Sequence, residues 1–264
     1  MPLFPPESIR ASYADWHWTV ANEWPEIATT WRLAARPPLD PRVRFLKVVR
    51  AGHYPTALDE SVRTQWASLF LPVPIVLDSG GGGDVEWLLT DALQGTDATR
   101  HALLAEPGAI VATLAHGLAE FHARAPVAQC PFDFRTAVAI EHARERVRRG
   151  TAQPKDLHPE FAHLTLDGAL GELERLRPRS EDLVVCHGDY CFPNILLDEA
   201  GTVTGYVDLA ELGVADRWWD VAVGAWSTTW NVGPGWEEVF YDAYGVEPDD
   251  DRITFYRLLY DLAS

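Results

Sequence analysis

A change of pattern near residue 92 is the feature that most limits the fold of this chain. Before it, short runs rich in β-branched and aromatic residues alternate with turn signals, which is typical of strands. One helical segment interrupts them at about residues 56–69, where Leu58, Val62, Trp66 and Leu69 lie on one apolar stripe. After residue 92 the apolar residues recur mainly at intervals of three and four, which predicts helices. The chain therefore has a β-rich N-terminal part and an α-rich C-terminal part.

The boundaries of the elements follow from these patterns and from the turn signals between them. Strands are predicted at Trp16–Glu23, Ala28–Ala34, Val43–Val49, Val73–Leu77 and Val85–Thr90, and a strand-rich insert at Leu183–Val207. Helices are predicted at Gly108–Arg124, Arg135–Arg149, Phe161–Leu176, Trp218–Thr228, Trp236–Tyr244 and Asp250–Leu262. The glycine run Gly80–Gly83 is predicted to be a flexible loop, and Pro37, Pro38 and Pro41 a turn.

The composition is that of an ordinary folded protein with a strong negative charge. Hydrophobic residues make up 47% of the chain and the formal net charge is −17. Nucleic-acid binding is not expected, because phosphate contacts require Lys and Arg. We expect no membrane association, since no run approaches the roughly 18 apolar residues of a membrane span and no signal peptide is evident. Three cysteines without metal spacing favour a reducing cytoplasm.

The negative charge is concentrated in the last third of the chain. Residues 181–264 hold 17 of the 39 acidic residues but only 3 of the 22 Lys and Arg. Taken alone, this imbalance favours a solvated surface that aids solubility. When these acidic residues lie beside a catalytic loop, the same imbalance favours a site that attracts a cationic substrate.

The segment from His187 to Asn194 carries the strongest chemical signal. Phosphoryl transfer requires a carboxylate near the attacking hydroxyl, oxygen ligands for Mg²⁺ and a cation on the phosphates. Asp189 and Asn194 stand five residues apart and can face one cavity across a tight loop. Asp208, after the next predicted strand, can complete a metal site, since Mg²⁺ prefers oxygen ligands. We therefore predict that Asp189 positions the acceptor hydroxyl and takes its proton, and that Asn194 and Asp208 bind the metal.

This order of motifs resembles the protein-kinase-like antibiotic phosphotransferases, and most closely the aminoglycoside 3'-phosphotransferases. The resemblance rests on the segments His187–Asn194, Asp208–Ala210, Leu212–Asp220 and Phe255–Leu259. It implies a two-lobed α+β fold, in which residues 1–92 form an antiparallel nucleotide-binding sheet with one helix. Residues 93–264 are then the larger, mostly helical lobe for catalysis and acceptor binding. The resemblance also implies ATP or GTP as phosphoryl donor and Mg²⁺ as cofactor.

The N-terminal part of the chain contains residues that match the nucleotide-binding residues of the family, in the same order along the sequence. Lys47, on the third predicted strand, is expected to reach the nucleotide phosphates, and Glu60 in the following helix to pair with it. Leu88–Ala92 resembles the linker between the lobes of the family. There the carbonyl of Thr90 and the N–H of Ala92 are expected to bond a purine edge.

Two segments depart from the family pattern. The family covers the triphosphate with a loop that bears Gly, Ser or Ala, whereas residues 22–30 contain no glycine and include Pro25. After the metal-binding Asp-Leu, the family usually has Gly-Arg, and this chain has Ala210 and Glu211. The charge next to the active site is thereby reversed.

The resemblance places four residues at the acceptor site. Glu211 and Asp261 suit a polycation, and Asp216 is expected either to brace the site or to contact the substrate. Trp230 stands where some members have an acid, and Tyr260 replaces the first of two acids near the C-terminal helix end. Because these residues differ from the family pattern, two acceptor classes remain open, an aminoglycoside and a cationic cyclic peptide of the tuberactinomycin type.

Other polar residues are predicted to be structural. His187 and Asp220 are expected to brace the catalytic loop by hydrogen bonds. His158 has no partner at a recognisable spacing and is expected at the surface, and Cys186 and Cys191 are expected to pack beside the loop.

Three functions remain open on the sequence. The first is an antibiotic kinase that causes resistance, acting as a monomer or weak dimer on a cationic small molecule. The second is a metabolic kinase of the same fold that acts on choline, a sugar or a hydroxylated amino acid. A nucleotide-binding pseudokinase scaffold is the third, and it is disfavoured because Lys47, Glu60, Asp189, Asn194 and Asp208 are all present.

Overall fold

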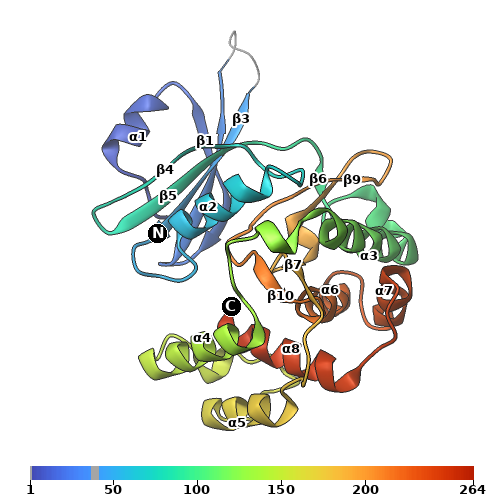
Figure 1. The fold of residues 1–264 in the computed structure, drawn as a ribbon. Coiled ribbons are helices and arrows are strands. Elements are labelled where there is room, and N and C mark those ends of the chain that lie inside the picture. The colour runs from blue at the N-terminus through green and yellow to red at the C-terminus, as the bar shows by residue number, and fades with distance from the viewer. Residues whose placement is uncertain (1, 37–41) are drawn as a thin grey trace. The chain divides into compact units, whose positions relative to one another are not determined.

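The computed structural model describes residues 2–36 and 42–264, so the proline turn predicted at 37–41 lies outside the described residues. Two compact units are present (Figure 1). The first comprises the chain up to Gln94 together with Gly205–Ala210, and the second comprises Gly95–Thr204 and Glu211–Ser264.

The first unit is built on a five-stranded antiparallel sheet in the order β1-β2-β3-β5-β4. Its strands are β1 (His17–Trp24), β2 (Ala28–Ala34), β3 (Val43–Arg50), β4 (Val76–Gly82) and β5 (Val85–Asp91). Strands β1, β2, β3 and β5 match the prediction to within one residue at each end. The short helix α1 (Glu7–Ser12), which the sequence pattern did not reveal, places Ile9 in the core of this sheet.

The prediction of a flexible loop at the glycine run was wrong. Gly80, Gly81 and Gly82 belong to β4 and pair with β5, with Gly80 opposite Trp87. A Cβ atom at Gly80 would lie 2.5 Å from the Trp87 ring, so the indole occupies the space of the missing side chain. Glycine is therefore needed here for close packing and not for mobility.

Helix α2 (Ala57–Ala67) packs on the sheet through small and polar residues and leaves much of its apolar stripe exposed. Its first turn is capped by Thr56, whose Oγ1 accepts a hydrogen bond from Asp59 N at 2.9 Å. The apolar residues Leu58, Val62 and Leu69 are 39%, 56% and 71% exposed. Small and polar residues face the sheet instead: Ala57, Glu60, Ser61, Thr64 and Ala67. Because these side chains are small, the helix can approach the sheet closely. The same orientation turns Glu60 toward β3.

The second unit is mostly helical. Its α-helices are α3 (Pro107–Arg124), α4 (Thr136–Arg149), α5 (Leu166–Leu176), α6 (Trp218–Asn231), α7 (Glu237–Tyr244) and α8 (Asp250–Ala263). Four short 3₁₀ turns lie at Ala102–Ala105, Val127–Gln129, Pro154–Asp156 and Phe192–Asn194. Its short strands are β6 (Thr96–Asp97), β7 (Leu183–Cys186), β8 (Ile195–Leu197) and β10 (Gly213–Asp216), and β9 (Val203–Tyr206) runs from this unit into the first. The predicted α+β class is confirmed.

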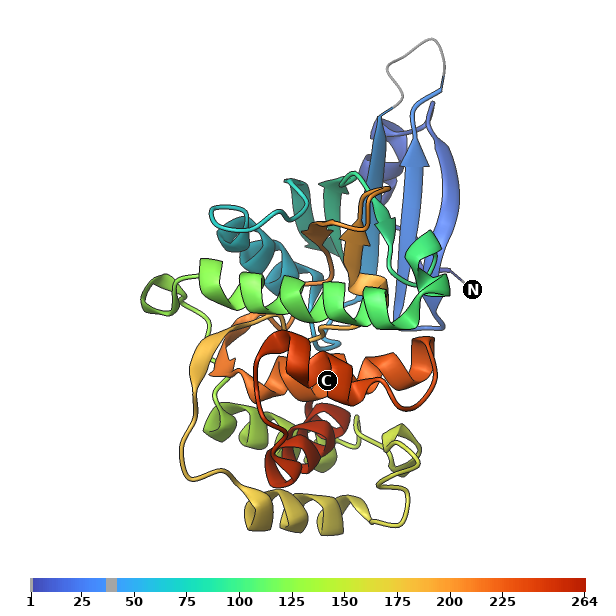
Figure 2. The ribbon, with the colours of Figure 1, turned by 90° about the vertical axis from the view of Figure 1, so that its right-hand side faces the viewer.

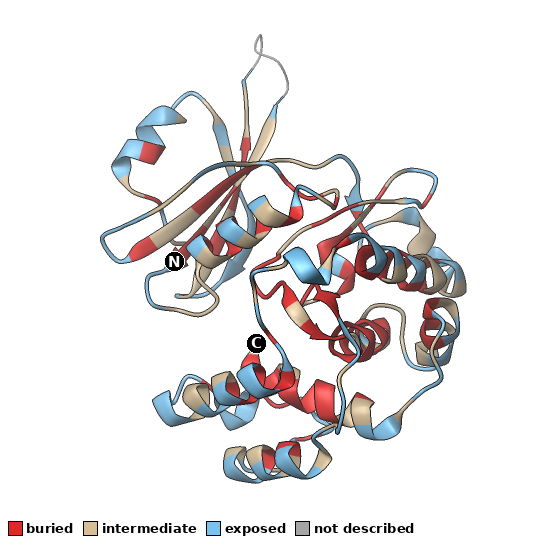
Figure 3. Ribbon diagram, in the orientation of Figure 1, coloured by how far each residue is buried: buried red, intermediate tan, exposed pale blue. Residues whose placement is uncertain are grey.

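Helix α6 is the most deeply buried helix among the described residues of the second unit. Eleven of its residues are buried, from Trp218 to Thr228, because α3, α7 and α8 all pack against it (Figure 3). Helix α8 in turn contacts α4 and α5, which Figure 2 shows beside it. The apolar stripe predicted on α3, including Ile110, Leu114 and Phe121, is buried as expected. Among the described residues, no helix has the length and apolar character to cross a bilayer.

The orientation of α2 can be tested with two lysine substitutions. Val62→Lys is expected to change the free energy of unfolding by less than about 0.5 kcal/mol, because Val62 lies on the solvent face. Ala67→Lys is expected to cost more than about 3 kcal/mol, because it places a charged side chain in a fully buried position. Urea unfolding of the two variants measures the difference, and equal losses would contradict the orientation of the helix.

Candidate active site

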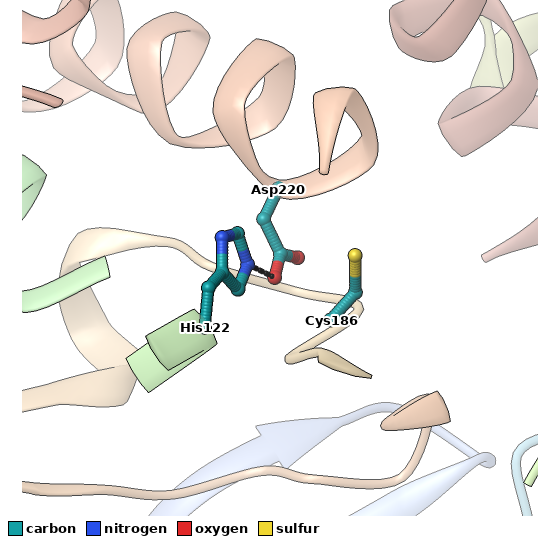
Figure 4. Close-up of side chains that lie close together, drawn as sticks. All are labelled: His122, Cys186 and Asp220. Carbon is teal, nitrogen blue, oxygen red and sulfur yellow. Dashed lines mark hydrogen bonds and ion pairs between the residues drawn. The ribbon is translucent and has the colours of Figure 1, made fainter. Parts of the chain in front are cut away.

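A single buried carboxylate fixes the start of the segment His187–Asn194, which we call the catalytic loop. Asp220, in the first turn of α6, accepts hydrogen bonds from the backbone N–H groups of His187 at 2.6 Å and Gly188 at 3.0 Å. Its Oδ2 also lies 2.9 Å from His122 Nε2 on α3, as Figure 4 shows (Figure 4). Because a carboxylate oxygen can only accept, His122 Nε2 is the donor to Asp220, and the hydroxyl of Tyr244 lies 2.8 Å from Nδ1. The bracing role predicted for Asp220 agrees with these contacts.

Figure 4 also shows Cys186 beside this pair, and the three side chains have the donor types of a metal site. The donor atoms of His122, Cys186 and Asp220 lie within 4.8 Å of one another. However, both oxygens of Asp220 already accept from the catalytic loop, and burial together with nearby carboxylates raises the pKa of the Cys186 thiol well above its usual value. A protonated thiol is a poor metal ligand. We assign the cluster to the support of the loop.

Gly188 is the residue of the motif that only glycine can fill. Its φ is +95°, and a Cβ atom would lie 2.5 Å from Glu211 Cβ and 2.7 Å from the Glu211 carbonyl oxygen. The carbonyl of Gly188 accepts a hydrogen bond from the indole N–H of Trp219 at 2.7 Å. Backbone geometry and packing therefore both require this residue.

Asp189 lies half-buried after this turn, and each of its carboxylate oxygens has a partner. Oδ2 accepts from Asn194 Nδ2 at 2.8 Å, and Oδ1 accepts from the hydroxyl of Tyr260 on α8 at 2.9 Å. The same Asn194 amide nitrogen bonds the carbonyl of Asp189 at 2.9 Å. The structure thus brings Asp189 and Asn194 together, and the amide oxygen of Asn194 is the atom that faces away from this pair.

In the first unit, Lys47 lies between two carboxylates. Its Nζ donates to Glu60 Oε2 at 2.7 Å and to Asp208 Oδ1 at 2.8 Å. Burial by itself lowers the pKa of Lys47, but the charges of Asp208 and Glu60 outweigh it and hold the pKa above the usual value. The predicted pair of Lys47 with Glu60 is present, and Lys47 is fully charged at neutral pH.

The N–H of Ala92, expected to face a purine, is engaged within the first unit. It donates to the carbonyl of Val43 at 3.1 Å, one step beyond the ladder that joins β3 and β5. Thr90 is buried in β5, opposite Phe45 and Val76. A nucleotide bond to Ala92 would have to replace this contact.

The three acidic residues predicted at the acceptor site are buried. Each has found a partner on a neighbouring element. Glu211 Oε2 accepts from the hydroxyl of Ser264 at 2.8 Å. Asp216 is fully buried, where desolvation raises its pKa, and it bonds Arg252 at 2.6 Å. This favours bracing over substrate contact for Asp216. Asp261 accepts from the backbone N–H of His158 at 2.8 Å and contacts the ring Nδ1 of the same residue.

Trp230 differs from these acids because it is 44% exposed. Its indole stacks on the imidazole of His158 at an interplanar angle of 10° and a centroid distance of 5.0 Å. The prediction of His158 as an unpartnered surface residue was wrong, since Asp261 and Trp226 also contact its ring. We call His158 and Trp230 the aromatic wall.

Several supporting residues have no signal in the sequence. Tyr260, His122 and Tyr244 touch the site from helices that lie far from the loop along the chain. No local motif marks them, because their roles depend on how α3, α7 and α8 pack against α6. For Tyr260 the one signal was that the family has an acid at this position.

Substitution of Gly188 tests how strictly the loop is shaped. Gly188→Ala is expected to lower the free energy of unfolding by about 3 kcal/mol or more and to reduce activity strongly, because it combines a positive φ with a steric clash. Gly150, the C-cap of α4, has a similar φ of +71° but no atom near its missing Cβ. Gly150→Ala is the matched control, with an expected cost of about 1 kcal/mol. Equal losses in thermal or urea unfolding would contradict the packing at Gly188.

Comparison with known proteins places these features in a family. The profile of the phosphotransferase enzyme family matches residues 26–256. An aminoglycoside 3'-phosphotransferase of Streptomyces fradiae is 36% identical over 96% of this chain and 97% of its own length. The crystal structure of an aminoglycoside-3'-phosphotransferase of type VIII superposes with a TM-score of 0.87 at 32% identity, covering 97% of both chains.

A further solved structure contains bound ligands. It is an aminoglycoside phosphotransferase from Streptomyces rimosus in complex with ADP and streptomycin, with a TM-score of 0.77 and 29% identity over 97% of this chain and 96% of its own. The chain therefore belongs to the phosphotransferase enzyme family and is itself a phosphotransferase.

Proposed function

We propose that this enzyme transfers the γ-phosphoryl group of a nucleoside triphosphate to a hydroxyl of a cationic antibiotic, with aminoglycosides as the acceptor class, and so confers resistance. The observation that carries the proposal is the carboxylate of Asp189, held by Asn194 and Tyr260 at the surface of the loop. The aminoglycoside phosphotransferases among its relatives support the acceptor class.

In the proposed reaction, Asp189 orients the acceptor hydroxyl and receives its proton as the bond to phosphorus forms. A half-buried carboxylate with partners on both oxygens keeps a fixed direction, and each oxygen retains a lone pair for a further donor. The Asp220 contacts hold the backbone beneath Asp189. These residues therefore supply positioning, which is the main task of a protein in phosphoryl transfer.

The donor is proposed to be ATP, with GTP as the alternative, and Lys47 is the proposed phosphate contact. Glu60 holds the ammonium of Lys47 in place, and Asp208 lies on its other side. Asn194 and Asp208 each offer an oxygen of the type that Mg²⁺ prefers, so these residues fit the metal that the family implies. When bound, Mg²⁺ neutralises charge that develops on the phosphates.

The aromatic wall is proposed to contact the acceptor. Trp230 exposes its indole, and the stacked His158 is anchored by Asp261. A flat, rigid aromatic face attracts ammonium groups and the apolar faces of sugar rings. The predicted role of Asp261 thus becomes indirect, because it holds His158 and does not face the substrate.

Two other acceptor classes are separated by the same experiment: a tuberactinomycin is included in the panel, and a metabolic acceptor is indicated when no antibiotic is phosphorylated. A cationic cyclic peptide of the tuberactinomycin type is favoured by the exposed Trp230, which stands where some relatives have an acid. The aromatic wall also suits the ammonium group of choline, whereas a sugar acceptor and the non-catalytic scaffold lack a specific supporting contact in the described residues.

The decisive experiment is phosphorylation of a panel of acceptors by the purified protein with Mg²⁺ and ATP or GTP. The panel contains an aminoglycoside with a 3'-hydroxyl, its 3'-deoxy analogue, streptomycin and a tuberactinomycin, and mass spectrometry detects the added phosphate. We expect product with an aminoglycoside and a loss of at least about 10³-fold in kcat for Asp189→Asn. Expression in a susceptible host is expected to raise its resistance to the same compound.

Phosphate on the tuberactinomycin alone would replace the proposed acceptor class. Nucleotide binding without any product would overturn the proposal in favour of a metabolic acceptor or a scaffold. Near-normal turnover by Asp189→Asn would remove Asp189 from its role.

The aromatic wall gives a separate prediction. Trp230→Ala is expected to raise the KM for the acceptor about tenfold and to leave the KM for the nucleotide within about twofold, because it removes only the exposed aromatic face. Steady-state kinetics with each substrate varied in turn measure both values. Thr229→Ala, the adjacent helix position, serves as the control, and an unchanged acceptor KM in Trp230→Ala would place the acceptor elsewhere.

A further inference from the structure

Tyr260 reaches the catalytic carboxylate from a part of the chain that carries no catalytic motif. Its hydroxyl lies 2.9 Å from Asp189 Oδ1, and it must be the donor because a carboxylate oxygen only accepts. The other oxygen of Asp189 is held by Asn194, which belongs to the same loop. Within the loop the Cys191 side chain also hydrogen-bonds Asp189, so Asp189 is held by Asn194 and Cys191 from its own loop and by Tyr260 from α8.

The hydroxyl of Tyr260 is a permanent donor. Burial, reinforced by the charge of Asp189, raises its pKa well above the usual value for tyrosine, so the phenol stays protonated at every pH of interest. Its helix is also firmly placed. Leu258, Leu259 and Leu262 are fully buried beside it, and the neighbouring Asp261 bonds His158. The donor is thus delivered by a rigid element.

This contact does little for folding. Asp189 is half-buried, and a carboxylate that water can reach recovers hydrogen bonds from solvent when a partner is removed. The geometry of Asp189 depends on the contact more strongly. Without Tyr260, only the loop partners Asn194 and Cys191 remain, and no group from a packed helix fixes the plane of the carboxylate.

We propose that Tyr260 is a positioning residue for phosphoryl transfer, which locks the plane of the Asp189 carboxylate and directs the remaining lone pair of Oδ1 toward the acceptor hydroxyl. The proposal rests on the proposed function, since it assumes that Asp189 receives the acceptor proton. It also gives a reason for tyrosine at a position where the family resemblance predicts an acid, because an acid next to Asp189 would repel it.

The test compares Tyr260→Phe with Tyr256→Phe, one helical turn earlier on α8. Tyr256 is fully buried and its hydroxyl contacts that of Thr136 at 3.1 Å, so its loss reports the structural effect of removing a phenol from this helix. For Tyr260→Phe we expect kcat to fall about tenfold. The KM values for nucleotide and acceptor should stay within about twofold, and the melting temperature should remain near that of the wild type.

Three outcomes would overturn the proposal. An unchanged kcat would show that Asp189 needs no partner on α8. A rise of acceptor KM at constant kcat would make Tyr260 a substrate contact. Equal losses of kcat and melting temperature in the two variants would leave only a structural role.

A second pair of variants keeps the test valid if Tyr260→Phe folds poorly. Tyr260→Lys and Tyr260→Met have similar reach, but only lysine offers a donor to Asp189. We expect the lysine variant to be more active than the methionine variant, and the reverse order would contradict the proposal.

Slow hydrolysis of the nucleotide without acceptor is measured for every variant as well. If no antibiotic is phosphorylated by the wild type, the proposed acceptor class fails, while the hydrolysis rates still decide the role of Tyr260. An about tenfold lower rate in Tyr260→Phe supports it, and an unchanged rate refutes it.

Discussion

The charge of Asp220 is the constraint on which the catalytic loop depends. A carboxylate that is completely buried costs several kcal/mol unless donors surround it. In this protein the donors are two successive backbone N–H groups of the loop and the imidazole of His122. The loop can satisfy Asp220 only in its bent form, so the penalty for an unpaired buried charge enforces the shape that presents Asp189. Tyr244 extends the same support through His122 to α7.

The charged group around Lys47 works by a different principle. One ammonium lies between two carboxyl groups, so the positive charge of Lys47 is already shared by Glu60 and Asp208. An incoming polyphosphate adds more negative charge, and the proposed reaction therefore needs further cations at this place. That requirement agrees with the Mg²⁺ that the family implies. Helix α2 supports the arrangement by turning its small and polar face, with Glu60, toward the sheet.

The sequence was most informative where a feature is local. The strands β1, β2, β3 and β5 follow from patterns within a few residues, and the spacing of Asp189 and Asn194 marks a tight loop.

Features that depend on partners far along the chain were missed or misjudged. The apolar stripe of α2 is mostly exposed, and periodicity alone does not show which face meets the sheet. The glycines of β4 read as a loop because their partner Trp87 lies on another strand. The partners of Glu211, Asp216 and Asp261, which are Ser264, Arg252 and His158, also carry no signal in the sequence.

Neighbouring residues on α8 serve two different tasks. Tyr260 contacts the catalytic carboxylate, and Asp261 anchors the aromatic wall through His158. Successive helix positions point about 100° apart, so a small rotation of α8 displaces both contacts at once. On the roles proposed for Asp189 and for the aromatic wall, changes of acceptor preference and of catalytic rate are linked through one helix. A lineage that remodels the wall by shifting α8 must also restore the alignment of Asp189, which restricts the order in which such mutations can accumulate.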